Sequence, residues 1–165
     1  MGIQENFQTL LISIEPNLKA GIDQIRYDLA RKGLTKTPPG TEIYLEQSIN
    51  LLTDEIFKAL NEIKADIYKP KEWDLIRSSL NEFIEGECNA FLDFLVGNWE
   101  QPASQVAIQL NILKSSLLKE CHTYIDRQKI KLSKGEQVSK DILKIVYYGL
   151  AAGIVGFLLK VILSR

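Results

Sequence analysis

Residues 142–163 read ILKIVYYGLAAGIVGFLLKVIL, and no other stretch of the chain restricts the fold so tightly. As a helix, these residues would span about 33 Å, close to the ~30 Å hydrocarbon core of a bilayer. Lys144 and Lys160 lie near the two ends and leave a charge-free run of 15 residues between them. That run is shorter than the ~18 residues typical of a transmembrane helix. The stretch therefore predicts either a single membrane-spanning helix or a helix buried in a core.

Small residues fall on one stripe of this expected helix, and two tyrosines precede them. The stripe consists of Gly149, Ala152, Gly153 and Gly156, and the tyrosines are Tyr147 and Tyr148. Glycine costs about 1 kcal/mol against alanine inside a water-exposed helix, but it is common where membrane helices pack closely. The stripe therefore favours the membrane reading and predicts a face for self-association. We expect the tyrosines at the membrane interface, where aromatic side chains gather.

Basic residues are concentrated around the same stretch. They are Arg127, Lys129, Lys131, Lys134, Lys144 and Lys160. Basic side chains beside an apolar helix predict contact with anionic lipid headgroups. They are more numerous before the stretch than after it, so the positive-inside rule places the N-terminal domain in the cytoplasm. We expect a tail-anchored, single-pass membrane protein, with a cytoplasmic protein as the alternative.

Upstream of this stretch, apolar residues recur at helical spacing over four segments, at about 3–31, 42–68, 70–96 and 102–132. Pro16 predicts a break or kink in the first segment, and Pro38-Pro39-Gly40 predicts a loop before the second. Ser133-Lys134-Gly135 predicts the end of the fourth. The pattern indicates an all-α fold, an antiparallel bundle of about four long helices followed by a C-terminal apolar, transmembrane helix. The expected parts are a cytosolic helical bundle at 1–132, a linker at 133–138 and a membrane-inserting helix at 139–165.

Charge divides unevenly along the chain. The net charge is −1 overall; residues 1–138 carry 16 basic and 20 acidic side chains, and residues 139–165 carry 4 and 1. A mildly acidic N-terminal part argues against nucleic acid as a partner. The two cysteines, Cys88 and Cys121, have no CxxC spacing, so we interpret them as structural thiols.

Residues that could carry chemistry are few. His122 is the only histidine; it follows Cys121 and precedes Asp126 by four residues. Adjacent helical residues point about 100° apart, so the Cys–His pair cannot serve as nucleophile and base, and we expect a surface pair of His122 with Asp126. We interpret Glu82, Glu85 and Glu87 as a solvated acidic face. The sequence predicts no catalytic residue, no metal ligand and no cofactor.

The expected function follows from the architecture. We predict a membrane-anchored helical interaction protein that forms a homo-oligomer and binds a lipid bilayer and an unidentified protein partner. In one version, self-association makes it a membrane-disrupting or pore-forming effector. The alternative is a soluble, all-α, oligomeric binding module whose apolar C-terminal helix is buried in the core.

Overall fold

The computed structural model describes the backbone of residues 2–163 and the side chains of residues 2–143. Four α-helices and one short 3-10 helix make up this part of the chain: α1 (Ile3–Arg31), α2 (Pro38–Ile63), η1 (Lys64–Asp66), α3 (Glu72–Trp99) and α4 (Ala103–Leu163). No strand occurs among the described residues. The prediction of an all-α protein is confirmed.

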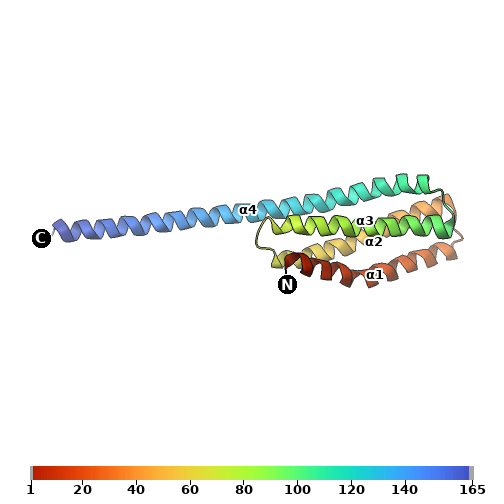
Figure 1. The fold of residues 1–165 in the computed structure, drawn as a ribbon, viewed down its shortest axis with the longest axis horizontal. Helices are drawn as coiled ribbons and strands as arrows, with labels where there is room; N and C mark the ends of the chain where they lie inside the picture. Colours follow the sequence, from red (N-terminus) through yellow and green to blue (C-terminus); the bar gives the residue numbers. More distant parts are fainter. Residues whose placement is uncertain (1, 164–165) are drawn as a thin grey trace.

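The helices pack side by side, and consecutive helices run in opposite directions (Figure 1). The closest helix pairs are α1 with α2 and α3 with α4, followed by α1 with α3 and α2 with α4. Each helix therefore has two neighbours, as at the corners of a square. The pair α2 and α4 has the least extensive contact of the four, and three hollows of the surface lie along it.

Helix α1 passes through Pro16 without ending, although it bends (Figure 1). A proline inside a helix removes one backbone hydrogen bond and clashes with the preceding turn. The helix nevertheless continues because its apolar stripe packs against the bundle on both sides of the proline: Phe7, Leu11, Ile14, Leu18, Ile22 and Leu29 are buried. The predicted kink is present and the predicted break is not.

Helix α2 begins at Pro38, four residues before the expected start at Glu42. Proline is tolerated in the first helical turn, where its missing N–H has no intrahelical partner. Thr37 caps the helix, because its Oγ1 accepts a hydrogen bond from the N–H of Gly40 at 3.1 Å. In the same turn, Thr41 donates from its hydroxyl to the backbone oxygen of Thr37 at 3.1 Å.

Helix α4 is one continuous helix from Ala103 to Leu163. The break expected at Ser133-Lys134-Gly135 is not formed, and residues 133–138, predicted as a linker, are helical. One interior glycine costs only about 1 kcal/mol, and an established helix elongates easily. Whether residues 1–132 and 139–165 behave as separate domains stays a prediction.

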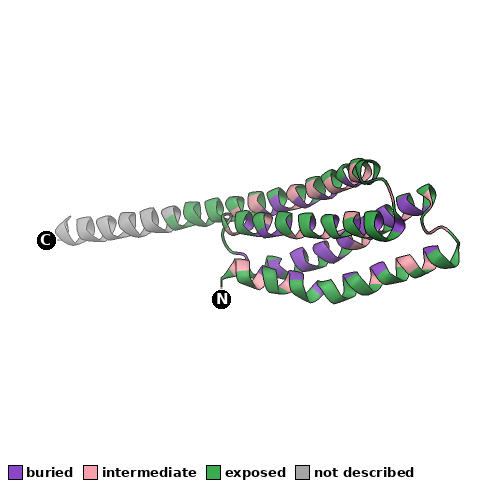
Figure 2. Ribbon diagram, turned by 45° about the vertical axis from the view of Figure 1, so that its right-hand side comes forward, coloured by how far each residue is buried: buried purple, intermediate pink, exposed green. Residues whose placement is uncertain are grey.

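The core is confined to the bundle. Its buried residues lie on the inner faces of all four helices (Figure 2), and the largest of the fully buried side chains are Trp73, Tyr44, Phe7 and Phe91. Among the residues whose side chains are described, the buried ones run from Phe7 to Gln128. The bundle therefore closes its core without any described part of α4 beyond Leu132.

The expected transmembrane helix at residues 142–163 needs correction. No helix in the part of the chain that the structure describes is both long and apolar enough to cross a bilayer. This finding contradicts the transmembrane, tail-anchored prediction. The physical reason is already visible in the sequence, since Lys144 and Lys160 limit the charge-free run to 15 residues. Individual side chains from residue 144 onward lie outside the described part.

Candidate functional site

Helix α4 continues past the end of the bundle, and its surface there is bare. All eleven residues from 133 to 143 are exposed. Three of them are large and apolar: Val138 is 59% exposed, Ile142 is 55% exposed and Leu143 is 66% exposed. Val138 and Ile142 are four residues apart and so lie on one face of the helix. An apolar face that its own bundle leaves uncovered is a candidate contact surface.

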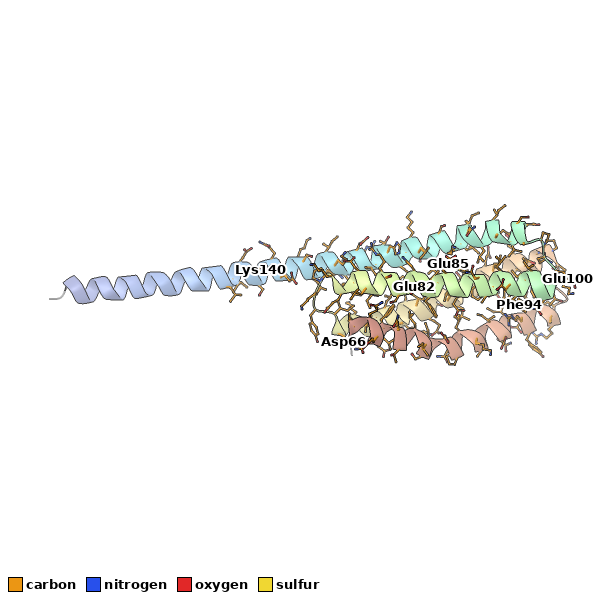
Figure 3. All side chains as sticks on the ribbon, in the orientation of Figure 1. Asp66, Glu82, Glu85, Phe94, Glu100 and Lys140 are labelled. Atoms are coloured by element: carbon orange, nitrogen blue, oxygen red, sulfur yellow. The ribbon has the colours of Figure 1, made fainter. Side chains whose placement is uncertain are left out.

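The basic residues predicted to contact lipid lie along α4. Arg127, Lys131 and Lys134 are exposed, and the Nζ of Lys129 lies 2.7 Å from Oδ1 of Asp74 on α3. Figure 3 labels Lys140 on the part of α4 that projects from the bundle. Contact of these residues with anionic lipid stays a prediction. The remaining predicted site residues lie outside the described side chains: Lys144, Lys160, Tyr147, Tyr148, Gly149, Ala152, Gly153 and Gly156.

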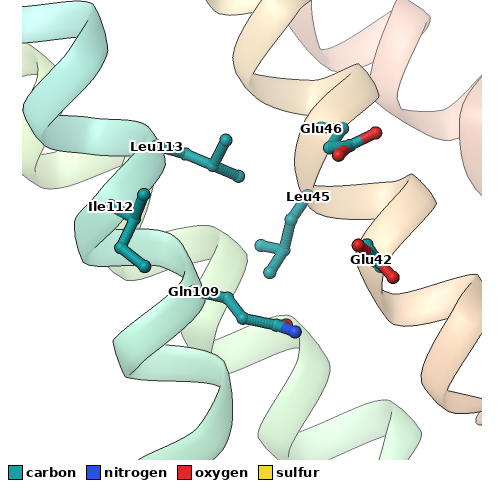
Figure 4. Close-up of a pocket in the computed structure, with 6 residues that line it drawn as sticks. All are labelled: Glu42, Leu45, Glu46, Gln109, Ile112 and Leu113. Carbon is teal, nitrogen blue, oxygen red and sulfur yellow. The ribbon is translucent and has the colours of Figure 1, made fainter.

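A shallow groove follows the seam between α2 and α4. Three hollows lie along it, from the first turn of α4 to Arg127, and the first two share Glu42 and Gln109. The middle hollow has a volume of about 150 Å³ and is lined by Glu42, Leu45, Glu46, Gln109, Ile112 and Leu113. In Figure 4, Leu45 of α2 and Leu113 of α4 point toward each other across it, and the two glutamates lie along α2.

The two sides of this groove differ in charge. Residues 101–113 contain no charged side chain. Ile108 is 64% exposed and Ile112 is 67% exposed, so this part of α4 presents an apolar strip to solvent. On the α2 side, Glu42 and Glu46 are exposed and four residues apart. Over residues 101–113 the groove is therefore an apolar strip with an acidic rim, which suits an apolar helix that carries basic residues. Further along, the third hollow is lined by Lys119, Glu120 and Arg127.

This groove was not predicted from the sequence. The signal was present, because Ile108 and Ile112 lie outside the apolar stripe of Val106, Leu110 and Leu117 that the bundle buries. A second apolar stripe on a bundle helix indicates a second contact surface. What the sequence alone could not show is that α2 is the neighbour that supplies the acidic rim.

A polar ladder joins α3 to α4 on the adjacent seam. Lys129 pairs with Asp74, Arg77 with Asp126, Asn81 with His122 and Glu85 with Lys114. The expected pair of His122 with Asp126 is not formed, because each residue finds its partner on α3 instead. Burial and then the positive charge of Arg77 lower the pKa of His122, and Asp126 opposes them. These contacts follow the antiparallel register of the two helices along the seam.

The groups considered for chemistry do not gather into a reactive site. Burial raises the pKa of the Cys88 thiol and of the Cys121 thiol to about 12. Glu85 pairs with Lys114, and Glu87 is half-buried. Within the described residues, no group of three or more His, Cys, Asp or Glu side chains is placed to hold a metal ion.

No family model, curated protein or solved structure matches this chain. The function is therefore argued from the geometry of the chain itself.

Proposed function

We propose that this protein acts by binding rather than by catalysis, as a self-associating helical module. In this proposal it is an antiparallel four-helix bundle whose last helix continues into an apolar segment, and that segment is buried against a second copy. The observation that supports the proposal is the projecting part of α4, where Val138, Ile142 and Leu143 are exposed. The earlier alternative placed this segment in the core of its own chain. The projection of α4 past the bundle favours a core shared between copies.

The composition of the segment supports association. Thirteen of the residues from 142 to 163 are Leu, Ile, Val or Phe. Burying one such side chain contributes roughly 1.5–3 kcal/mol. Association costs about 4–15 kcal/mol in lost translation and rotation. Burial of half of these side chains would contribute roughly 10–20 kcal/mol, which is enough to offset most or all of the cost of association. A lone apolar helix in water has no tertiary packing to stabilise it.

Sedimentation velocity over a range of protein concentrations tests the proposal. We expect the full-length chain to be oligomeric and Ile142→Asp to dissociate it, because a carboxylate in the apolar contact is costly to bury. Asn89→Asp, at an exposed position of α3, is the control, since it adds the same charge outside the projecting segment and outside the groove between α2 and α4. It should leave the oligomer intact.

A shortened chain provides a second test. A chain that ends at Gly135 retains every described buried residue, because the last of them is Gln128. We expect it to remain helical and to be monomeric. A full-length protein that sediments as a monomer at every concentration would overturn the proposal, as would a shortened chain that associates as strongly as the full-length one.

A further inference from the structure

We propose that two copies pair reciprocally, each laying its projecting part of α4 antiparallel along the groove between α2 and α4 of the other. This inference rests on the proposed function, and it adds the contact surface and the symmetry. It commits to a second copy of this chain as the occupant of the groove.

The described projecting part of α4 is long enough to cover the bundle part of a second copy. The part of α4 within the bundle, residues 103–132, has 30 residues, and the projecting part, residues 133–163, has 31. Each spans about 45 Å at 1.5 Å per residue. Two such helices, related by a twofold axis near Ser133, would place each projecting half beside the other copy's bundle half over its whole length. A twofold contact of this kind is closed, because each copy gives and receives the same surface.

In this register, apolar residues of one copy lie level with apolar residues of the other. With Ser133 on the axis, residue 154 of one copy lies level with Ile112 of the other, and residue 158 lies level with Ile108. These residues are Ile154 and Leu158 in the sequence. The exposed pair on the bundle is spaced by four residues, and so is the apolar pair on the segment. The exposed strip of one copy and the apolar pair of the other therefore lie at the same level and have the same spacing.

The charges of the segment and of the groove are complementary. In the same register, Lys160 lies level with Val106, and the hollow at Val106 is also lined by Glu42. Glu46 lies one turn further along α2. The basic end of the segment therefore meets the acidic rim of the groove. The whole chain shows the same complementarity, since residues 1–138 carry more acidic than basic side chains and residues 139–165 the reverse.

Charge reversal with rescue tests this pairing. We expect the double variant Glu42→Lys, Glu46→Lys to raise the dissociation constant of the full-length oligomer at least tenfold. Adding Lys160→Glu to that variant should recover most of the loss. The matched control is Glu82→Lys with Asp93→Lys, two exposed acidic residues of α3, which should leave the dissociation constant unchanged. Circular dichroism checks that each variant remains folded.

Disulfide cross-linking tests the register. We expect a mixture of Ile108→Cys and Leu158→Cys chains to form a mixed dimer on oxidation, and a mixture of Ile108→Cys and Leu150→Cys to form far less of it. The native thiols do not interfere, because both are buried. Efficient cross-linking of Leu158→Cys to itself would instead indicate that two projecting segments pair with each other.

The two proposals fail in different ways. If the full-length chain never associates, both are wrong. If it associates but charge reversal has no effect, or position 158 cross-links only to itself, the reciprocal pairing is overturned and the self-associating module stands.

Discussion

The Nε2 atom of His122 lies 2.9 Å from Oδ1 of Asn81, across the seam between α4 and α3. Since the amide oxygen can only accept, Nε2 carries the hydrogen in this contact. This contact of His122 with Asn81 lies between the ion pair of Arg77 with Asp126 and the ion pair of Glu85 with Lys114. It places the only imidazole of the chain in a partly buried position beside a cation.

The first prediction concerns this imidazole. Its folded-state pKa lies below the ordinary value of 6.5, because burial and Arg77 disfavour the charged ring. Below pH 6.5 the unfolded chain takes up a proton that the folded chain resists, so stability should fall as the pH drops from 6.5 toward the folded pKa. An NMR titration of the ring protons measures that pKa. His122→Gln should remove this part of the pH dependence, and a measured pKa above 6.5 would contradict the assignment.

Glu87 makes a second pH-dependent contribution to the stability of the fold, and its sign is opposite to that of His122. Burial and then the negative charge of Glu15 raise the pKa of Glu87. The folded chain therefore favours the protonated form, and stability from this group is lost as the pH rises from the unfolded value of 4.5 through the folded pKa. We expect Glu87→Gln to be more stable than the parent chain at pH 7 in urea unfolding. The gain should vanish at pH 4, and a gain that is equal at both pH values would show another cause.

The cysteines should be unreactive in the folded protein. With the pKa of each thiol raised to about 12 by burial, the thiolate that attacks disulfide reagents is scarce at pH 8. We expect an aromatic disulfide reagent to label neither Cys88 nor Cys121 at an appreciable rate until denaturant is added. Fast labelling without denaturant would mean that α3 and α4 separate readily.

Gly40 should not tolerate a side chain. A Cβ there would lie 1.8 Å from the backbone oxygen of Leu34, so the α1–α2 loop would have to move. Overpacking of this kind costs about 1–3 kcal/mol, and we expect Gly40→Ala to lower the free energy of unfolding by at least that much. Gly86→Ala is the control, since its Cβ would meet no atom within 4 Å. It should stabilise α3 by up to about 1 kcal/mol, through helix propensity.

Arg26 holds the end of the bundle near the α1–α2 loop. Its guanidinium carbon lies 3.7 Å from the ring centroid of Phe94, and one of its nitrogens donates to the Tyr44 hydroxyl at 3.1 Å. A lysine keeps the charge but loses the flat stacking surface. We expect Arg26→Lys to cost about 1 kcal/mol in thermal unfolding. The loss should shrink in a Phe94→Leu background, where there is no ring to stack on.

The inner faces of the helices could be predicted from the sequence, and their ends could not. The stripe of Phe7, Leu11, Ile14 and Leu18 is buried as its spacing indicates, because a 3.6-residue period records which face packs. Local signals at helix ends are weaker than packing. Pro38 and Pro39 were interpreted as a loop but form the first turn of α2, and Gly135 was interpreted as a break but lies within α4.

The partners of each helix were also beyond prediction. An apolar stripe shows which side of a helix faces inward, but it does not show which helix lies opposite. The contacts of His122 with Asn81 and of Asp126 with Arg77 depend on the register of α3 and α4, so neighbours on α4 could not reveal them. The same holds for the groove, where Glu42 comes beside Ile112 only through the pairing of α2 with α4.

The lack of any interruption in α4 has a mechanical consequence. Because α4 is one unbroken helix, it fixes both the distance and the rotation of its projecting half relative to the bundle. In the reciprocal pair, this rod would hold the two bundles at a fixed separation of about 45 Å, set by 1.5 Å per residue. Inserting one residue near Gly135 would lengthen the rod by only ~1.5 Å, but it would turn the projecting face by about 100°. Such an insertion would uncouple the two copies without touching either surface.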